Sequence, residues 1–185
     1  MRQALVEMRA VWRRLTTRSR KSARARLPAP PAGDLPIEQL VKIRADAAES
    51  YRADENGIEG ESFWAEPLGA DRYRLRNSAW YVYDLHFLDI VRAVPREPGH
   101  LPTIVSVVER SGHQTLRVLF DAATPEYEVR QTLLWLNDAA VSHEQAQGRF
   151  YALDARPEAD FSAVCDELWR LEQAGKLHYE TGSTD

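Results

Sequence analysis

Hydrophobic and polar residues alternate through the segment Thr103 to Phe120, and the rest of the chain is organised around it. Apolar side chains occupy alternate positions in its two halves: Val105 and Val107, then Leu116, Val118 and Phe120. A two-residue period is typical of strands, because successive side chains point to opposite faces. Ser111 and Gly112 lie between the halves and favour a tight turn. The pattern therefore predicts two strands joined as a β-hairpin.

The chain before this segment contains short alternating runs separated by turn residues. Strands are expected at Val41 to Ile43, Glu61 to Leu68, Arg72 to Asn77 and Asp89 to Val94. Within the third run, Tyr73 and Leu75 should face inward and the arginines between them outward. Asp54 to Gly57 reads as a turn, while the aromatic run Trp80 to Tyr83 has no assignable face. Several short strands at close spacing predict a small barrel, which leaves no open sheet edge.

The chain after the hairpin alternates between strand and helix patterns. Thr124 is expected to cap a helix with Pro125 at its first position, and Asn137-Asp138 to end it. Strands follow at Ala140 to Gln145 and Phe150 to Ala155, then a helix introduced by Asp160 and stopped by Gly175, then a strand at Leu177 to Thr181. This order is the ferredoxin-like βαββαβ arrangement, with four antiparallel strands and both helices on one face.

These elements together predict an α+β protein. A small N-terminal β-barrel, residues 37–110, is followed by a ferredoxin-like domain, residues 111–182, and the hairpin fuses the two. Residues 1–36 are expected to form a basic arm and a proline-rich linker with little order, because prolines restrict the backbone and remove hydrogen-bond donors.

Composition narrows the class of protein. The 185 residues are 44% hydrophobic, which suits a chain with a buried core. No apolar run approaches the roughly 18 residues that a membrane-spanning helix needs. The single cysteine, Cys165, excludes an internal disulfide and a cysteine-cluster zinc site, and it is expected to fill the core. These features and the charged N-terminus favour a cytoplasmic protein without a signal peptide.

The net charge of −4 conceals a basic N-terminus on an acidic body. Residues 1–27 contain nine Lys and Arg residues and one acid, Glu7. Within residues 2–15 the apolar positions form one helical stripe, so this arm can bind nucleic acid, an anionic surface or a partner. A solvated extension, an upstream start codon or an organelle presequence is the alternative. The residues assigned to nucleic-acid contact are Arg9, Arg13, Arg14, Arg18, Arg20 and Lys21.

Three runs carry a family pattern: W-A-E-P-L-G at residues 64–69, D-I-V-R-A at 89–93 and V-E-R-S-G-H-Q-T-L-R-V at 108–118. They resemble an uncharacterised bacterial family described only as a domain of unknown function, over roughly residues 40 to 182. The resemblance implies a β-rich front half and an α+β back half, and it brings no activity. The chain departs from the pattern at Asn77, which no proline follows, and at Asp84-Leu-His86.

His113 is the most suggestive single residue, since it lies beside Ser111 and close to Arg117 in the sequence. A histidine there can act as a general base or bind an anion, or it can cap the turn and join the two domains. No G-x-S-x-G run surrounds Ser111, so a catalytic triad is not indicated. Ser111 and His113 are the candidates for catalysis, which is not assigned. Ligand contact is assigned to Ser111, His113, Arg117, Trp64 and Glu66.

Asp84, His86 and Asp89 have a spacing that can bring oxygen and nitrogen ligands to one metal ion. On a strand, however, Asp89 would lie on the face opposite Asp84 and His86, which favours an ordinary polar loop. No metal and no cofactor is therefore expected.

The leading functional hypothesis is a cytoplasmic interaction or regulatory module without catalytic machinery, binding a protein partner. An acidic body suits a basic partner, because charge complementarity assists encounter. The first alternative is a nucleic-acid or anionic-surface binder that acts through residues 2–26. The second is a small-molecule site or hydrolase at the turn between Ser111 and His113. The oligomeric state stays open.

Overall fold

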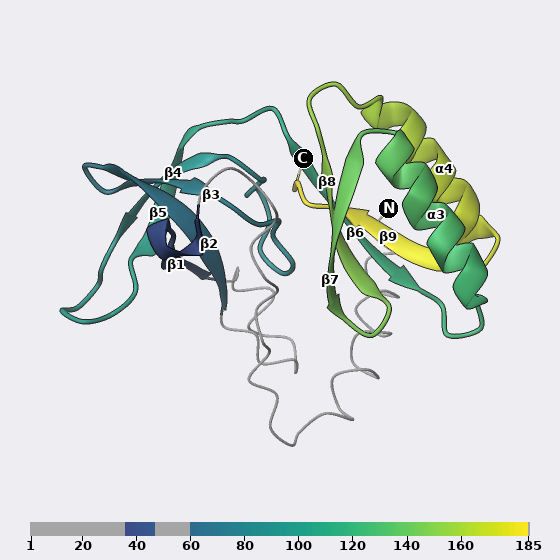
Figure 1. The fold of residues 1–185 in the computed structure, drawn as a ribbon, viewed down its shortest axis with the longest axis horizontal. Helices are drawn as coiled ribbons and strands as arrows, with labels where there is room; N and C mark the ends of the chain where they lie inside the picture. Colours follow the sequence, from purple (N-terminus) through teal and green to yellow (C-terminus); the bar gives the residue numbers. More distant parts are fainter. Residues whose placement is uncertain (1–35, 47–59, 185) are drawn as a thin grey trace, which may run out of the picture.

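The computed structural model describes residues 36–46 and 60–184 and shows a mixed α+β protein (Figure 1). Its strands form a closed five-stranded barrel and a separate four-stranded sheet. The predicted arm, most of the predicted linker and the predicted turn at Asp54 to Gly57 lie outside the described residues.

The barrel follows the chain order β1-β2-β3-β4-β5. A short 3-10 helix, Ile37–Gln39, precedes its strands, which are β1 (Val41–Asp46), β2 (Gly60–Gly69), β3 (Arg72–Leu75), β4 (Ile90–Val94) and β5 (Thr103–Glu109). Sequential strands pair antiparallel, and the barrel closes where β1 meets β5 in parallel at Arg44 and Thr103. Alternate side chains of each strand fill the interior, which includes Ile43, Phe63, Leu75, Val91 and Ala93. The predicted barrel is thus confirmed.

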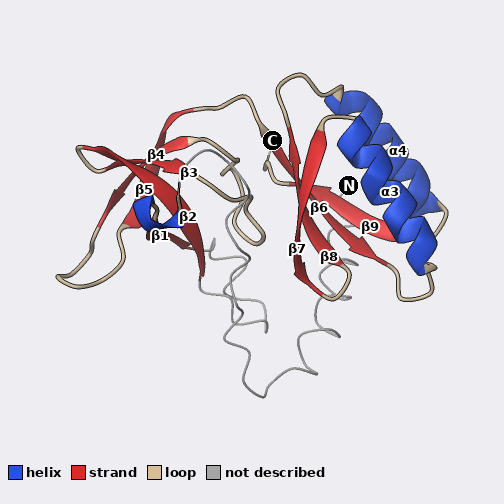
Figure 2. Ribbon diagram, viewed as in Figure 1, coloured by secondary structure: helices blue, strands red, loops and turns tan. Residues whose placement is uncertain are grey.

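The four-stranded sheet has the order β7-β8-β6-β9, and every neighbouring pair is antiparallel. Its strands are β6 (Gln114–Phe120), β7 (Val141–Gln147), β8 (Phe150–Ala155) and β9 (Leu177–Thr181). Two helices, α3 (Glu126–Asp138) and α4 (Phe161–Gln173), lie side by side on one face of this sheet (Figure 2). They bury an apolar core against it that includes Leu116, Val118, Leu136, Leu153 and Leu168.

The helix ends match the sequence in part. The helix that was expected to follow Asp160 is α4, and the Asp160 side chain caps it by accepting a hydrogen bond from the Ala163 N–H at 3.1 Å. Gly175 follows α4 with φ of 68°, a conformation that glycine adopts without strain. The prediction for α3 was wrong, because Pro125 occupies the cap position and no side chain caps the helix. The Thr124 hydroxyl instead donates to the Lys176 carbonyl at 2.7 Å and ties the start of α3 to β9.

The predicted hairpin at Thr103 to Phe120 is also wrong, although both of its strands exist. β5 pairs with β4 and β1 in the barrel, whereas β6 pairs with β8 and β9 in the sheet. The alternating pattern located the strands but carried no information about their partners. All six residues from Thr115 to Phe120 are buried, as expected for a central strand that is covered on both faces, and both edges of β6 are taken by β8 and β9.

The second face of the sheet is covered by residues 76–89, which connect β3 to β4 and which we call the insertion segment. Trp80 from this segment packs with Leu119, Phe150 and Ala152 of the sheet. The aromatic run Trp80 to Tyr83, for which the sequence indicated no face, therefore lies between the barrel and the sheet. Figure 1 shows the insertion segment between the two.

Candidate functional site

The turn between β5 and β6 is held by a buried carboxylate. Asp89, which is fully buried, accepts hydrogen bonds from the backbone N–H groups of His86 at 3.1 Å and Ser111 at 2.9 Å. Arg110 donates to the same carboxylate at 2.9 Å. The Ser111 hydroxyl lies 2.6 Å from the Phe87 carbonyl oxygen and 3.1 Å from Asp89 Oδ1. The Ser111 side chain is thereby committed to anchoring the turn on the insertion segment.

The His113 ring is hydrogen-bonded to a carboxylate of the sheet and not to the Ser111 hydroxyl. Its Nδ1 lies 2.8 Å from Asp154 Oδ1, and its ring contacts the Phe87 ring edge-on at 5.4 Å between centroids. Burial raises the pKa of Asp154, an effect that the hydrogen bond and charge of His113 oppose. The backbone N–H of His113 donates to Ser111 Oγ at 3.2 Å. Ser111 and His113 are thus brought together, but not in the nucleophile-to-base geometry of acyl transfer.

Arg117 is buried, with 1% of its surface exposed, and holds the insertion segment against β6. Its guanidinium donates to the carbonyls of Ala79 at 3.2 Å and of Val82, and to Glu180 at 2.9 Å. It also lies over the Tyr83 ring, 4.6 Å from the centroid. Each of the three guanidinium nitrogens therefore donates a hydrogen bond, which a buried arginine requires. Through these bonds Arg117 holds the insertion segment on the sheet, and we call it the buried clamp.

The barrel holds the same segment from the other side. Glu61, on β2, accepts the backbone N–H groups of Trp80 at 2.8 Å, Tyr81 at 2.9 Å and Val82 at 3.3 Å. Burial raises the pKa of Glu61, while the backbone hydrogen bonds and the charge of Arg117 act in the opposite direction. Barrel and sheet are therefore joined through a segment whose N–H groups face a carboxylate and whose carbonyls face an arginine.

The three residues weighed as metal ligands have separate partners. Burial lowers the pKa of His86, and its Nδ1 accepts a hydrogen bond from the Thr115 N–H at 3.1 Å. The Asp84 carboxylate accepts from the backbone N–H and the hydroxyl of Thr184, at 3.0 and 2.8 Å. Within residues 36–46 and 60–184, no three His, Cys, Asp or Glu side chains are grouped so as to hold a metal ion.

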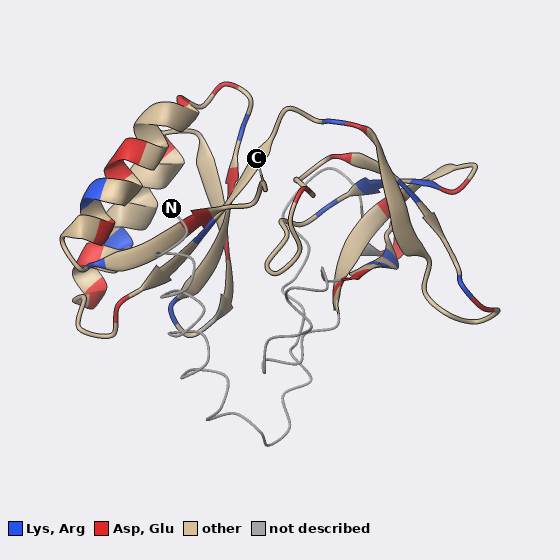
Figure 3. Ribbon diagram, turned by 180° about the vertical axis from the view of Figure 1, so that it is seen from behind, with Lys and Arg blue, Asp and Glu red and all other residues tan. Residues whose placement is uncertain are grey.

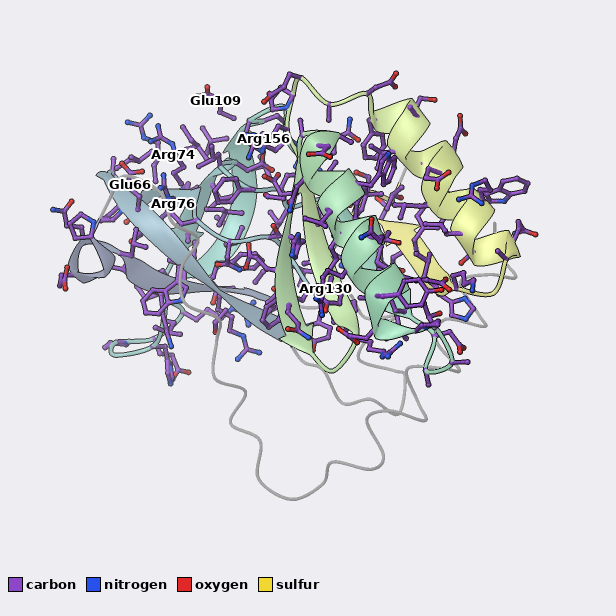
Figure 4. All side chains as sticks on the ribbon, turned by 45° about the vertical axis from the view of Figure 1, so that its right-hand side comes forward. Glu66, Arg74, Arg76, Glu109, Arg130 and Arg156 are labelled. Atoms are coloured by element: carbon purple, nitrogen blue, oxygen red, sulfur yellow. The ribbon has the colours of Figure 1, made fainter. Side chains whose placement is uncertain are left out.

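Trp64 and Glu66 lie on the barrel, away from the Ser111 turn. The Lys42 ammonium is 5.0 Å from the centroid of the Trp64 ring. Glu66 accepts a hydrogen bond from Arg74 at 3.1 Å and lies 3.8 Å from Arg76. The three side chains are labelled in Figure 4. The five residues assigned to ligand contact therefore fall in three places: the turn, the buried clamp and the outside of the barrel.

The two helices carry exposed large apolar side chains that the sequence analysis missed. Tyr127 and Leu134 on α3 and Trp169 on α4 are 67%, 52% and 57% exposed. Tyr127 and Leu134 are seven residues apart and so share one side of α3. Acidic residues recur along both helices (Figure 3), and residues 121–185 contain thirteen Asp and Glu against five Lys and Arg. The available signal was the presence of large apolar residues off the inward stripe of each helix.

Residues 61–179 match the family model described as Domain of unknown function (DUF4265), which is well over half of the chain. The chain belongs to this family. The matched range begins at the buried Glu61 and includes the insertion segment, Arg117, both helices and the start of β9. The finer residue pattern that suggested the family remains a prediction.

A solved structure described as the "Novel crystal structure of a hypothetical protein from Neisseria gonorrhoeae" is similar to this chain, with a TM-score of 0.64 and 14% identity. The similarity covers 78% of this chain and 94% of that one, and at this identity it concerns the fold alone. A comparison with curated proteins gives no match. In the described part of the chain, neither helix is long and apolar enough to cross a membrane.

Proposed function

We propose that this protein is a non-catalytic interaction module that binds a protein partner on the outer side of α3 and α4. The observation that carries the proposal is the helix surface, which we define as Tyr127, Leu134 and Trp169, each more than half exposed. Tyrosine and tryptophan are enriched among the residues that dominate binding energy, because they bury much apolar area with few rotatable bonds.

The charge around this surface indicates the chemistry of the partner. The Tyr127 hydroxyl donates to Glu128 at 3.0 Å, and Asp166 precedes Trp169 by about one helical turn. A basic, amphipathic segment fits such a surface, since its apolar side covers the aromatic rings and its cations meet the carboxylates.

The experiment is a co-purification of the tagged full chain from its source cells, with mass spectrometry of the retained proteins. A variant carrying Tyr127→Ala and Trp169→Ala should lose the partner that the wild type retains. The matched control carries Val105→Ala and Val108→Ala on the barrel, where both valines are also about half exposed, at 53% and 51%. Equal retention by all three proteins would refute the helix surface as the binding site.

Binding of nucleic acid or an anionic surface through residues 2–26 is the second candidate. Its support is the nine Lys and Arg residues against one acid in residues 1–27. Affinity of this kind falls steeply with salt, because bound cations release counterions from phosphates. Deleting residues 1–36 should abolish salt-sensitive retention on nucleic acid, and retention unchanged by the deletion would remove this candidate.

A small-molecule site at Ser111 and His113 is the third candidate, supported by the hydrogen bond between His113 Nδ1 and Asp154. That bond orients the ring and leaves Nε2 for a ligand. A thermal-shift screen of small phosphates and carboxylates provides the test. Stabilisation that persists unaltered in His113→Ala would argue against the site.

We also infer that residues 37–110 and 111–182 are two domains and that the second is ferredoxin-like. Support for this comes from the sheet order β7-β8-β6-β9, with α3 and α4 on one face. A cytoplasmic location stays part of the proposal and rests on the single cysteine.

A further inference from the structure

A band of cations runs across the outside of the barrel. On β1 to β4 the outward residues alternate with the buried ones, so the strand register decides which outward side chains are neighbours. Arg72 and Arg74 lie on the outer side of β3, about 7 Å apart, and Arg76 continues the series just past the end of the strand. Arg92 on β4 and Lys42 on β1 are also outward and exposed. We call this set the basic band: Lys42, Arg72, Arg74, Arg76 and Arg92.

Two arginines of the basic band are placed against each other. Arg72 and Arg92 are directly opposite in the antiparallel pair of β3 and β4, and both are exposed. Among the described residues, neither forms an ion pair. Like charges directly opposite each other destabilise a sheet, so the stability of the barrel does not account for this pair. An anion bound between the two guanidinium groups removes the repulsion.

The basic band contains one carboxylate, Glu66, which holds two of the arginines without neutralising them. It accepts a hydrogen bond from Arg74 at 3.1 Å and lies 3.8 Å from Arg76 (Figure 4). A guanidinium has five N–H donors, so both arginines keep donors for a ligand after they have contacted Glu66. Because one negative charge faces two positive charges, this part of the band also stays positive.

The side chains of the band favour a phosphate backbone as the ligand. Four of its five cations are arginines, whose planar fork binds phosphate oxygens in pairs. No large apolar side chain is exposed on β2, β3 or β4, all of which the structure describes. A surface that binds a membrane inserts apolar side chains, and the centre of a protein interface buries them. The band lacks both features.

An aromatic ring lies within the band. Trp64 on β2 is opposite Lys42, and its carbonyl accepts the Arg76 N–H at 2.9 Å, so the ring stands between two cations of the band. The Trp64 side chain is partly exposed, and the Lys42 ammonium is 5.0 Å from the ring centroid. Cations along a backbone path, together with aromatic rings on which bases stack, are the usual means of binding single strands without sequence preference.

We propose that the basic band binds single-stranded nucleic acid, with phosphates on its arginines and a base on Trp64. Lys42 is exposed and flexible, so its ammonium can pass from the ring to a phosphate when a base stacks there. The site lies on the barrel, apart from α3 and α4 (Figure 1), and it uses none of the residues 2–26. It is therefore independent of the helix surface and of the N-terminal arm.

The test is fluorescence anisotropy of a labelled oligouridylate of about 16 nucleotides, titrated with the full chain. Arg72→Gln combined with Arg92→Gln should weaken binding by about tenfold or more, and the slope of log affinity against log salt should decrease by about 1.4. The matched control is Arg130→Gln combined with Arg156→Gln, two exposed arginines outside the barrel that are labelled in Figure 4. It changes the net charge equally and should alter affinity by less than about twofold. Residues 2–26 are present in every protein, so their contribution is the same in each.

Trp64→Leu separates stacking from charge. It should weaken binding by about tenfold with the salt slope unchanged, because the substitution removes a stacking surface and no cation. Affinity equal to that of the wild type would refute nucleic acid as the ligand of the band. The same conclusion would follow if a polyglutamate peptide of equal charge bound the band more tightly than the oligouridylate, because the ligand would then be an acidic protein segment.

Two further results would overturn the site itself. One is an equal loss of affinity in the two double variants, which would mean that net charge alone governs binding. The other comes from a nuclear magnetic resonance titration of the wild type with the oligouridylate, in which the backbone amides of β2, β3 and β4 should shift. Shifts confined to residues 2–26 would place the nucleic acid on the arm. This measurement needs no substitution, so it decides the matter even if a variant fails to fold.

Discussion

The two faces of the four-stranded sheet are buried by different chemistry. The face under α3 and α4 is apolar and includes Leu116, Val118 and Leu153. The face under the insertion segment carries Arg117 and Asp154, both nearly inaccessible to solvent. Cross-strand pairs place these residues strictly by the two-residue period, Leu116 with Leu153 and Arg117 with Ala152. β6 therefore contributes apolar side chains to the core under α3 and α4, and on its opposite face it contributes the arginine that binds the insertion segment.

The contrast indicates a division of labour. Apolar burial is non-directional and stabilises many arrangements of similar shape. The polar face is satisfied only when the carbonyls of Ala79 and Val82 and the N–H groups facing Glu61 are in register. We expect the helix face to supply most of the stability of the sheet, and the polar face to fix how the barrel is seated on it.

The largest effect is expected from Arg117→Met. The substitution removes every donor to Ala79, Val82 and Glu180 while keeping much of the side-chain volume. Unpaired buried acceptors should lower the free energy of unfolding by about 4 kcal/mol, measured by urea denaturation. Arg130→Met on the exposed surface of α3, labelled in Figure 4, is the control and should change it by less than about 0.5 kcal/mol. A stable Arg117→Met protein would show that the polar face is dispensable.

On the apolar face, Leu168→Ala should lower the free energy of unfolding by about 3 kcal/mol, because the fully buried side chain leaves a cavity under α4. The insertion segment should stay docked, since no atom of Leu168 belongs to the polar face. Hydrogen exchange at Trp80 and Val82 is the discriminating measurement. If Leu168→Ala released these amides while the sheet remained folded, the two faces would not be independent.

Dependence on pH should also separate the faces. Glu144 has a pKa raised to about 7, and burial raises the pKa values of Glu61 and Asp154 as well. A group whose pKa is raised by folding stabilises the folded state fully at pH values below its unfolded pKa. This stabilisation is lost as the pH rises through its folded pKa. The free energy of unfolding should therefore fall by about 3 kcal/mol at most from pH 4.5 to 8 through Glu144. The slope should be smaller in Glu144→Gln and unchanged in Leu168→Ala, as urea midpoints measured across pH will determine.

The sequence predicted elements well where one periodic pattern sufficed. The strand expected at Phe150 to Ala155 is β8, and Asp160 caps α4 as its side-chain chemistry requires. Prediction failed where the partner comes from far along the chain. Arg117 alternates with apolar residues along its strand and was assigned to ligand contact, whereas the partners that it has in the fold, Ala79 and Val82, lie 38 and 35 residues away in the sequence. The residue pattern contains no signal for a loop that returns to cover a second face.

The candidate sites were harder to predict for the same reason. For His113 the sequence left open a ligand contact, a general base or a structural role that joins the two domains, and it did not connect Asp89 and Asp154 with the Ser111 turn that they hold. Asp89 and Ser111 are 22 residues apart in the sequence. They form a 2.9 Å hydrogen bond because the insertion segment folds back on the turn. Exposure of Tyr127 and Trp169 likewise depends on which side of each helix meets the sheet.

The smallest expected effect lies outside both faces. Trp169→Ala removes a side chain that is 57% exposed on α4, so the free energy of unfolding should change by less than about 1 kcal/mol. The same substitution should weaken retention of the protein partner, because an exposed tryptophan buries its ring on binding and adds to the binding energy. Trp80→Phe is the opposite case, since Trp80 is 7% exposed and packs on the polar face of the sheet. It should loosen the insertion segment and leave partner retention intact. A loss of retention in Trp80→Phe with none in Trp169→Ala would move the interaction surface from the helices to the junction between barrel and sheet.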